Sequence, residues 1–474
     1  MRILFVEDHG LFADEMQPLL WKIPGVDYVR LAKSQSSALT ALNEEFFDLI
    51  VLDLRIPVDD HGLVADKGNG QKVFYSAIDT CPGIQIFILT GSDMDEFTKR
   101  LARFGEKTDL WGSGVAANTL DYFEKENAAK LIEEVTQVAA EIGTLKKVEI
   151  NSRGRELGLT HGFSRIISVG ARRLGGSKVD VVPLSGGLSK ARVMRCTVRA
   201  QNDQPVAQMV VKLGPKRHVE TEIRAYNRYV KSLPVGFFPP LMETVEKGAC
   251  GSSGAFYRLA DNYDRTLFDI IDHGTDGSSV VRSIKANTKI WSDAFDLKTT
   301  TIKEFRRKLV NDDIATEIFS RYDLDFEKVE RLSVSYRSSC AHGDLHGGNV
   351  LVDGRLQPVM IDFGDVDHQS SCIDPITLEL SCIYHPDGAR IFAANNLKKL
   401  LPIWLNRDEY ESRHPFPHFV KTCRDWAYDV AGGDTAFNAC SYAYVLRQLK
   451  FSTVEPELTI GLLRGIVAAI SARA

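Results

Sequence analysis

The segment "AHGDLHGGNVLVDGRLQPVMIDFGD", residues 341–365, places costly polar groups beside runs of aliphatic residues. Histidines, aspartates and an asparagine surround "VLV" and "VMI", two runs with the composition of buried strands. Charged and amide groups are expensive to bury unless partners or ions compensate them. The segment therefore predicts a binding site that short buried strands hold in place.

The spacing of these polar groups is typical of phosphoryl transfer from ATP. Asp344 and Asn349 form the pattern D-x-x-x-x-N, and Asp362 follows in "IDFG". A kinase-type phosphotransferase needs one carboxylate near the attacking hydroxyl, and an amide with a second carboxylate to hold Mg²⁺ against the ATP phosphates. The three residues are candidates for these roles.

Two upstream residues have the character of a nucleotide-binding ion pair. Lys212 ends the apolar, strand-like run of "QMVVKLG". Glu222 lies three residues after Val219 and four before Tyr226, on the inward face of the helix predicted to follow. We therefore expect Glu222 to pair with Lys212. Before them, "PLSGGLSKARV" predicts a glycine-bearing turn between strands that can approach phosphate oxygens.

On these motifs, residues 178–474 resemble the aminoglycoside phosphotransferase and choline kinase group of kinase-like folds. The resemblance implies an α+β bilobal domain, with a sheet-rich N-lobe and hinge at 178–264 and a helical C-lobe at 265–474. The segment after "DFG" has no A-P-E element, which favours a small-molecule acceptor and leaves a protein acceptor open. A looser resemblance is to the kinase-like domains associated with bacterial ternary-complex conflict systems.

The same resemblance assigns roles to the residues named above. It implies that Asp344 is the catalytic base and that Asn349 and Asp362 are Mg²⁺ ligands. It also implies that Lys212 and Glu222 bind ATP through their ion pair.

Three further polar residues of this region are expected to be structural or stay open. His342 is expected to pack against the "DFG" turn, and Asp374 in "IDPITLEL" to anchor the local fold. His346 lies either at the mouth of the substrate site or in an ordinary loop.

Residues 1–142 alternate short β-branched runs with longer amphipathic ones. The strand-like runs are "ILFV" (3–6), "YVRLA" (28–32), "LIVLD" (49–53) and "IFILT" (86–90). This alternation predicts an α/β doubly wound, flavodoxin-like domain whose parallel sheet lies between two layers of helices. A helix with an apolar stripe from Leu131 to Ile142 closes the domain.

Acidic residues follow two of these strands. Glu7 and Asp8 come directly after the first strand, and Asp53 ends the third. Groups at the carboxyl ends of neighbouring parallel strands converge on one crevice. Three carboxylates there would repel one another unless a hard cation such as Mg²⁺ lay between them. The alternative is a flavodoxin-like domain whose acidic residues are merely solvated.

With Thr90 at the end of the fourth strand, and Tyr122 and Lys125 in "LDYFEKE", this set resembles the response-regulator receiver domain over residues 1–142. The resemblance implies that Asp53 accepts a phosphoryl group from a histidine kinase and that the three carboxylates hold Mg²⁺. Thr90 and Lys125 would contact the phosphoryl oxygens, and Tyr122 would be the aromatic switch residue. The stretches after Asp53 and between Thr90 and Lys125 are longer than the family's usual ones.

Bulk properties agree with a soluble protein of two or three domains. Charged residues make up 26% and apolar residues 44%, and the net charge of −5 gives no reason to expect a nucleic-acid partner. Eight cysteines without a CxxC pair favour a reducing compartment. No stretch predicts a signal peptide or membrane span, so we expect a cytoplasmic protein.

Residues 143–177, rich in charge and glycine, are the predicted linker.

Two functional hypotheses follow from this organisation. The first is a two-component response regulator whose output is an ATP-dependent phosphotransferase, controlled by phosphorylation of Asp53 and acting on a hydroxyl-bearing small molecule or protein. The second is a response regulator whose kinase-like region is an inactive, nucleotide-sensing scaffold. A DNA-binding regulator would need a basic helix-turn-helix, and none is evident after residue 142.

Overall fold

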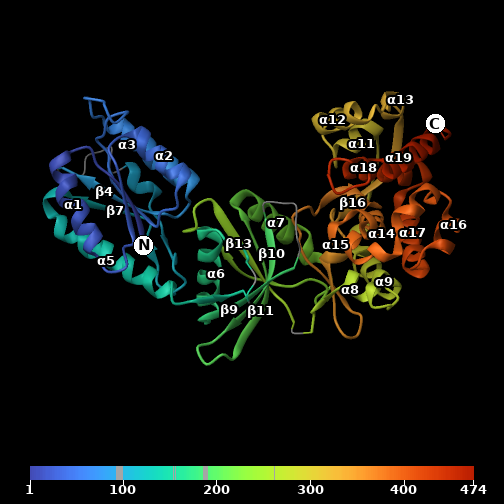
Figure 1. The fold of residues 1–474 in the computed structure, drawn as a ribbon, viewed down its shortest axis with the longest axis horizontal. Helices are drawn as coiled ribbons and strands as arrows, with labels where there is room; N and C mark the ends of the chain where they lie inside the picture. The colour runs from blue at the N-terminus through green and yellow to red at the C-terminus, as the bar shows by residue number, and fades with distance from the viewer. Residues whose placement is uncertain (92–99, 153, 155, 185–190, 261, 474) are drawn as a thin grey trace. The chain divides into compact units, whose positions relative to one another are not determined.

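The computed structural model describes every residue except 92–99, 153, 155, 185–190, 261 and 474 (Figure 1). The chain divides into two compact units. The first comprises Met1–Pro183, Gly187–Val219 and Leu241–Leu259, and the second comprises Leu184–Gly186, Glu220–Pro240 and Ala260–Ala474.

The first unit begins with the predicted parallel sheet. Its strands are β1 (Arg2–Val6), β2 (Tyr28–Ala32), β3 (Leu49–Asp53), β4 (Gln85–Thr90) and β7 (Leu120–Glu124), in the order β2-β1-β3-β4-β7. Every pairing in it is parallel. The order is that of flavodoxin-like doubly wound sheets, so the carboxyl ends of β1 and β3 are adjacent.

Helices cover both faces of this sheet, as the alternating pattern predicted. They are α1 (Gly10–Lys22), α2 (Gln35–Glu44), α3 (Lys67–Thr80) and α5 (Ala128–Leu145). Ile3 and Phe5 of β1 share a buried cluster with α1 and α5, whereas Leu4 and Val6 share one with α2 and α3. Alternate side chains of a strand point to opposite faces, which explains the two separate cores.

The long stretch between Thr90 and Lys125 carries elements of its own. They are the 3-10 turn η1 (Ala102–Phe104) and the paired strands β5 (Lys107–Thr108) and β6 (Ala117–Asn118), followed after β7 by η2 (Lys125–Asn127). Between β5 and β6, Leu110 and Trp111 are buried. This insertion therefore contributes to the core of the unit.

The segment 143–177, expected to be a linker, contains β8 (Glu149–Asn151) and α6 (His161–Arg173). Phe163, Ile166, Ile167 and Val169 of α6 are buried. The glycine and charge that suggested a linker are concentrated before residue 162, and the amphipathic stripe of α6 begins directly after them. Because its apolar face needs cover, α6 packs as an integral helix of the unit.

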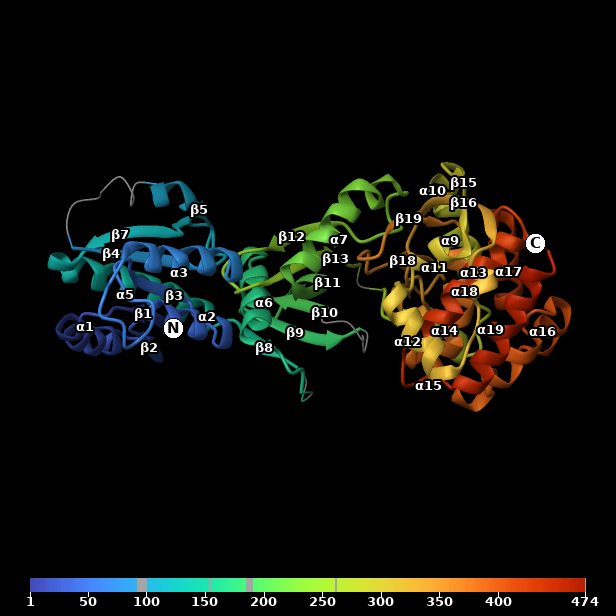
Figure 2. The same ribbon diagram turned by 90° about the horizontal axis from the view of Figure 1, so that it is seen from above.

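A second sheet completes the first unit. Its strands are β9 (Lys178–Pro183), β10 (Arg192–Arg199), β11 (Pro205–Pro215), β12 (Leu241–Val245) and β13 (Ser252–Arg258), in the order β12-β13-β11-β10-β9-β8. All neighbours are antiparallel except β8 and β9. Helix α6 lies along this sheet (Figure 2), and one buried cluster joins both to α1 and α5.

The second unit is predominantly helical, as expected from strands early and helices late. Its helices are α8 (Leu267–Asp272), α9 (Ser278–Asn287), α10 (Lys289–Asp293), α11 (Ile302–Arg307), α12 (Asp312–Tyr322), α13 (Glu327–Glu330), α14 (Ile373–Tyr384), α15 (Pro386–Ile391), α16 (Arg407–Arg413), α17 (Pro417–Ala431), α18 (Asp434–Gln448) and α19 (Pro456–Ser471). Helix α7 (Lys216–Arg228) enters it, followed by η3 (Val230–Ser232). Two further turns are η5 (Ala393–Asn395) and η6 (Leu397–Ile403).

Two small sheets hold the segment 341–365, which contains Asp344, Asn349 and Asp362. One contains β14 (Arg265–Thr266), β17 (Val350–Val352) and β18 (Pro358–Met360), and the other contains β15 (Asp296–Thr301), β16 (Ser333–Ala341) and β19 (Asp367–Ser370). Strands β17 and β18 are the "VLV" and "VMI" region, and both are buried throughout. The turn η4 (Gly347–Asn349) leads into β17.

Helix α14 is buried along its whole length and is fixed by an internal ion pair. Arg424 of α17 donates to Glu379 of α14 through Nε and Nη2, at 2.6 and 2.9 Å, and Trp404 Nε1 donates to the same carboxylate at 2.8 Å. A buried charge pair persists only when its hydrogen bonds are satisfied in this way. The start of the same helix carries Asp374, which accepts hydrogen bonds from the backbone of His342 and Gly343.

Among the described residues, none of the helices combines the length and apolar character needed to cross a membrane.

Candidate phosphoryl-transfer sites

The predicted acidic cluster lies at the carboxyl ends of β1 and β3. Glu7, Asp8 and Asp53 each offer a carboxylate oxygen, and these oxygens all lie within 4.8 Å of one another. Burial raises the pKa of Glu7, and the charge of Asp53 raises it further. Burial and Asp53 likewise raise the pKa of Asp8. The cluster therefore holds negative charge at a cost that a nearby cation would relieve.

Lys125 supplies one such cation. Its Nζ lies 2.6 Å from Asp53 Oδ2 and 2.7 Å from Glu7 Oε2. Burial alone would lower the pKa of Lys125, but Asp53 and Glu7 outweigh it and the pKa is raised. Lys125 begins η2 directly after β7, at the same sheet edge as Asp53. The structure thus brings Lys125 to the acidic cluster.

The two remaining receiver positions are placed less completely. Thr90 is the last residue of β4 and pairs in register with Glu124, one residue before Lys125, but its side chain lies outside the described residues. Tyr122 in β7 is half-buried, and burial with the charge of Asp121 raises its pKa to about 12. The contact role of Thr90 and the switch role of Tyr122 stay predictions.

The donor set of the cluster fits Mg²⁺. Carboxylate oxygens are the ligands that this hard cation prefers, and three of them converge here. Lys125 contacts Asp53 Oδ2, while Asp53 Oδ1 accepts from the backbone N–H of Arg55 at 2.9 Å. Both oxygens of the proposed phosphoacceptor are therefore oriented by the protein.

In the second unit, Asp374 holds the start of the loop 342–349, which contains the candidate residues Asp344 and Asn349. Its Oδ2 accepts from the backbone N–H of His342 at 2.8 Å, and its Oδ1 accepts from that of Gly343 at 2.9 Å. Gly343 has φ +83°, and an added Cβ would lie 2.5 Å from Asp365 O. Only glycine fits this position without strain. Asp374 is the anchor that its position in the sequence suggested.

Backbone and side-chain hydrogen bonds bring the three motif residues together. Asn349 Nδ2 donates to Asp344 O at 2.9 Å, and Ile361 N donates to Asn349 O at 3.0 Å, which sets Asp362 beside the loop. Asn349 is buried, whereas the Asp344 side chain is 37% exposed. With its Nδ2 engaged, Asn349 keeps its amide oxygen for a cation, so the donor set fits Mg²⁺ here as well.

Asp362 has an unusual backbone conformation. Its φ is +64°, in the left-handed region that aspartate tolerates better than most residues. It is half-buried between Ile361 and Phe363, which are both buried. Strained conformations of this kind persist where the surrounding structure fixes them, frequently at functional sites.

His342 has the packing role expected of it. It is fully buried, its Nε2 lies 3.0 Å from Ile361 O, and its ring centroid is 5.8 Å from that of Phe363. On the other side, Phe363 lies 5.9 Å from the ring of Tyr226 in α7. A buried cluster of tilted aromatic rings thus packs around Phe363 of the "DFG" turn.

The structure places His346 in a buried stack next to Asp344. Its ring centroid lies 4.0 Å from that of His385, and its Nε2 is 3.9 Å from Asp344 Oδ2. Burial lowers the pKa of His346 well below its ordinary value, and His385 lowers it further, while Asp362 opposes the shift. Burial also lowers the pKa of His385. His346 is therefore a buried neutral group at neutral pH.

These two lowered pKa values predict a loss of stability in acid. The folded-state pKa of each imidazole is below the ordinary value of 6.5, so the unfolded chain binds protons more tightly. The stabilising contribution is complete above pH 6.5 and declines as pH falls below it. We expect the urea concentration at the midpoint of unfolding to decrease as the pH is lowered from 7 to 5.

A matched pair of variants tests this pH dependence. His385→Asn keeps an acceptor for the backbone N–H of Asp387, which His385 Nδ1 now caps at 3.2 Å, but removes one buried imidazole. It should flatten the decline below pH 6.5, whereas His273→Asn, at an exposed position, should leave it unchanged. An equal decline in both variants would refute the assignment.

Lys212 and Glu222 lie on the elements expected for them. Lys212 is buried on β11, in register with Ala255 of β13, and Glu222 is fully buried on α7. Lys212 belongs to the first unit and Glu222 to the second, so the ion pair between them stays a prediction.

The sequence did not reveal two cations that interact with Asp344. Arg447 of α18 places Nη1 4.0 Å from Asp344 Oδ1, and Lys450 follows three residues later. The two are about a hundred residues downstream of the motif along the chain. Nothing in the local sequence marks them, because only the packing of α18 brings them to Asp344.

No protein-family model and no curated protein matches the chain. Solved structures resemble parts of it. A response regulator receiver domain (CheY-like) from Methanospirillum hungatei JF-1 is 21% identical, with a TM-score of 0.22, over 30% of this chain and 94% of the other. A thermostable mutant of aminoglycoside phosphotransferase APH(4)-Ia is 13% identical, with a TM-score of 0.32, over 62% and 94%. Choline kinase LicA from Streptococcus pneumoniae is 10% identical, with a TM-score of 0.30, over 62% and 94%.

These neighbours fall in the two groups that the sequence resembles, a receiver domain and the aminoglycoside phosphotransferase and choline kinase fold. All three identities are below 25% and all three TM-scores are below 0.5, so the chemistry has to be argued from the residues of this chain.

Proposed function

We propose that the protein is a response regulator whose output region transfers the γ-phosphoryl group of ATP to a hydroxyl-bearing acceptor. The observation that carries the proposal is the fixed geometry of the catalytic loop. Asn349 Nδ2 donates to the carbonyl of Asp344, and the backbone N–H of Ile361 donates to the carbonyl of Asn349. These bonds support placing the proposed base and the two proposed Mg²⁺ ligands on connected backbone. These are the parts that phosphoryl transfer requires.

In this mechanism Asp344 orients the acceptor hydroxyl and takes its proton. The hydroxyl oxygen forms a bond to the γ-phosphorus as the bond from that phosphorus to the β-phosphate oxygen breaks, and ADP leaves. Asn349 and Asp362 would hold Mg²⁺, which neutralises phosphate charge when bound. The resemblance to the phosphotransferase group implies that Lys212 and Glu222 bind the α- and β-phosphates. The 37% exposure of the Asp344 side chain leaves it accessible to an acceptor.

The receiver-like region would control this reaction through Asp53. A histidine kinase donates the phosphoryl group to an Asp53 carboxylate oxygen, with Glu7 and Asp8 helping to hold Mg²⁺. Lys125 already contacts Asp53 Oδ2 at 2.6 Å and would contact a phosphoryl oxygen there. The phosphoryl group on Asp53 would place a dianion next to Lys125 and Thr90. Modifications of this kind shift the equilibrium between two conformations of a protein segment.

Contacts within the first unit offer a physical route for control. Arg172 Nη1 of α6 donates to Trp111 O at 3.2 Å, and Arg173 Nη2 donates to Asp109 O at 2.6 Å. Both acceptors lie in the insertion between Thr90 and Lys125, and Arg165 of α6 also pairs with Asp48. These contacts join the insertion to α6, which packs on the sheet that carries Lys212.

The eight cysteines are free in the structure, and this supports action in a reducing compartment such as the cytosol.

The test compares ATP turnover by the wild type and by Asp53→Asn, each with and without the phosphoryl mimic beryllofluoride. The mimic should change the wild-type rate several-fold in either direction and leave Asp53→Asn unaffected. Asp59→Asn, an exposed carboxylate in the loop after Asp53, is the matched control and should respond like the wild type. Identical rates under all conditions would remove the regulatory claim.

A further inference from the structure

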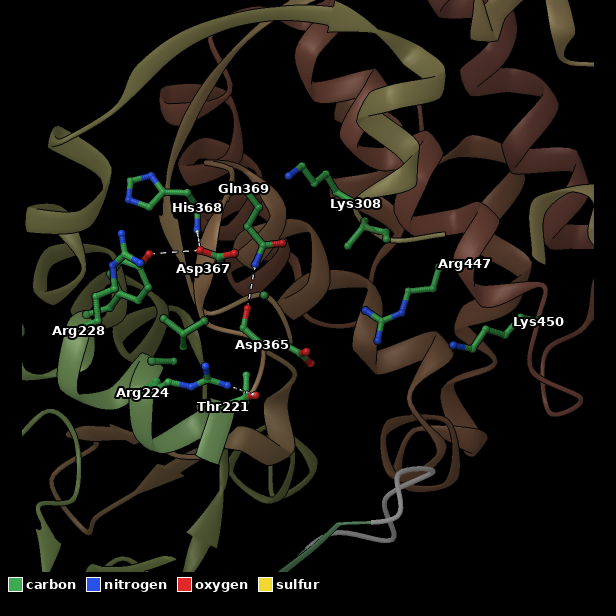
Figure 3. A pocket seen from close by; sticks show the side chains of 16 residues that line it. Thr221, Arg224, Arg228, Lys308, Asp365, Asp367, His368, Gln369, Arg447 and Lys450 are labelled. Atoms are coloured by element: carbon green, nitrogen blue, oxygen red, sulfur yellow. Dashed lines mark hydrogen bonds between the residues drawn. The ribbon is translucent and has the colours of Figure 1, made fainter. Parts of the chain in front are cut away.

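A cavity of about 660 Å³ lies beside the catalytic loop (Figure 3). All its lining residues belong to the second unit. Gly343, which precedes Asp344, lines it, as do Gly364 and Asp365, which follow Asp362 in the "DFG" turn. Its volume is in the range of pockets that take small molecules.

The lining of this cavity is strongly basic. Its cationic side chains come from three parts of the unit, namely α7, the end of α11 and the end of α18: Arg224, Arg228, Lys308, Arg447 and Lys450. Against these five cations stand two carboxylates, Asp365 and Asp367. Figure 3 shows Arg224 and Arg228 on one side and Lys308, Arg447 and Lys450 on the other. A cavity with this surplus attracts anions and repels cations.

The protein itself does little to neutralise this charge. Among the ion pairs of the described part of the chain, none joins Arg224, Arg228 or Lys308 to a carboxylate. Asp367 accepts hydrogen bonds from Tyr229 Oη at 3.3 Å and from the backbone N–H of His368 at 2.8 Å. The charges of Arg224, Arg228 and Lys308 therefore remain available to a ligand, while Arg447 faces Asp344 and Lys450 faces Asp344 and Asp365.

Arg447 links the basic cavity to the proposed chemistry. It lines the cavity and also lies 4.0 Å from Asp344 Oδ1. Burial lowers the pKa of Lys450 and the charge of Arg447 lowers it further, while Asp344 and Asp365 oppose the shift. A guanidinium group binds phosphate oxygens in a bidentate fashion, and an ammonium group adds a point charge. An anion held by both would bring the rest of its molecule next to Asp344.

We propose that the phosphoryl acceptor is a small phosphate monoester with a free hydroxyl group, held through its phosphate by Arg447 and Lys450. This inference rests on the proposed phosphotransfer at Asp344. The acceptor hydroxyl gives its proton to Asp344 and forms the new bond to the γ-phosphorus, ADP leaves, and the acceptor's original phosphate is unchanged. A more conservative interpretation, in which Arg447 only pairs with Asp344, leaves Lys450 without a role.

The first experiment measures binding without turnover. Inorganic phosphate is titrated into Asp344→Asn protein that is saturated with ADP and Mg²⁺, and binding is followed by calorimetry. The Kd should rise about tenfold or more when Arg447→Gln or Lys450→Gln is added, because each removes a charged hydrogen-bond donor. Lys303→Gln, an exposed cation of α11 outside the cavity, should leave the Kd unchanged. Equal phosphate binding in all variants, or no binding, would overturn the anion site.

The second experiment identifies the acceptor class. A small-molecule extract is separated on an anion-exchange column, and each fraction is incubated with wild-type protein and labelled ATP. The inference expects labelled product only from the retained fractions, with at least a tenfold loss in Arg447→Gln. Label from the unretained fraction, or label in protein alone, would overturn the acceptor class while leaving phosphotransfer intact. Phosphate binding without transfer from any fraction would instead refute the proposed enzymatic function.

Discussion

Asp344→Asn should lower ATP turnover by about 10²–10⁴-fold, the range expected when a positioned general base is removed. The amide cannot accept the proton of the attacking hydroxyl, but it keeps the size of the side chain. Because the Asp344 side chain is 37% exposed, the substitution should leave the fold and ATP binding unchanged. The measurement is release of ADP with Mg²⁺, with ATP binding followed separately by thermal shift.

The matched control for this prediction is Asp313→Asn, an exposed carboxylate on α12. It should turn over ATP at the wild-type rate. If Asp344→Asn and Asp313→Asn release ADP equally, catalysis at this loop is refuted. Retained ATP binding in that case would favour the alternative, a nucleotide-sensing scaffold.

Asp53→Asn should abolish phosphoryl incorporation into the receiver-like region. An amide is not a nucleophile for this reaction, so incorporation from acetyl phosphate, or from a histidine kinase, should fall by about a hundredfold or more. The mixed anhydride forms on a carboxylate oxygen, and Lys125 at 2.6 Å is placed to stabilise the product. Incorporation is measured as one added phosphoryl group by intact-protein mass spectrometry.

Asp14→Asn provides the comparison for this prediction, because Asp14 is an exposed carboxylate on α1 of the same region. It should retain full incorporation. Chelation of Mg²⁺ should reduce incorporation in both the wild type and Asp14→Asn, since three carboxylates converge at the site. Undiminished labelling of Asp53→Asn would exclude Asp53 as the phosphoacceptor.

Local pattern was sufficient to predict the elements that carry the candidate sites. The four runs in residues 1–142 became β1 to β4, and Glu7, Asp8 and Asp53 meet because strand ends in a doubly wound sheet must share an edge. In the second unit, "VLV" and "VMI" became β17 and β18. These features depend on periodicity over a few residues, which a sequence records directly.

The local sequence pattern did not predict helix α6, because glycine and charged residues precede its apolar stripe. The interval 143–177 looked like a linker, yet α6 buries Phe163, Ile166 and Ile167. The core that joins α6 to α1 and α5 requires side chains from distant parts of the chain. A helix of this kind gains its stability from tertiary packing more than from its own propensity.

The sequence by itself determined which groups could perform chemistry: Asp53 at a strand end, and Asp344, Asn349 and Asp362 around two short strands. Tertiary structure alone decided which distant charges face them. Arg447 reaches Asp344 only through the packing of α18, and the basic cavity combines side chains from three separate elements. The reason is physical: backbone periodicity is local, whereas electrostatic surroundings depend on distances that only the folded chain sets.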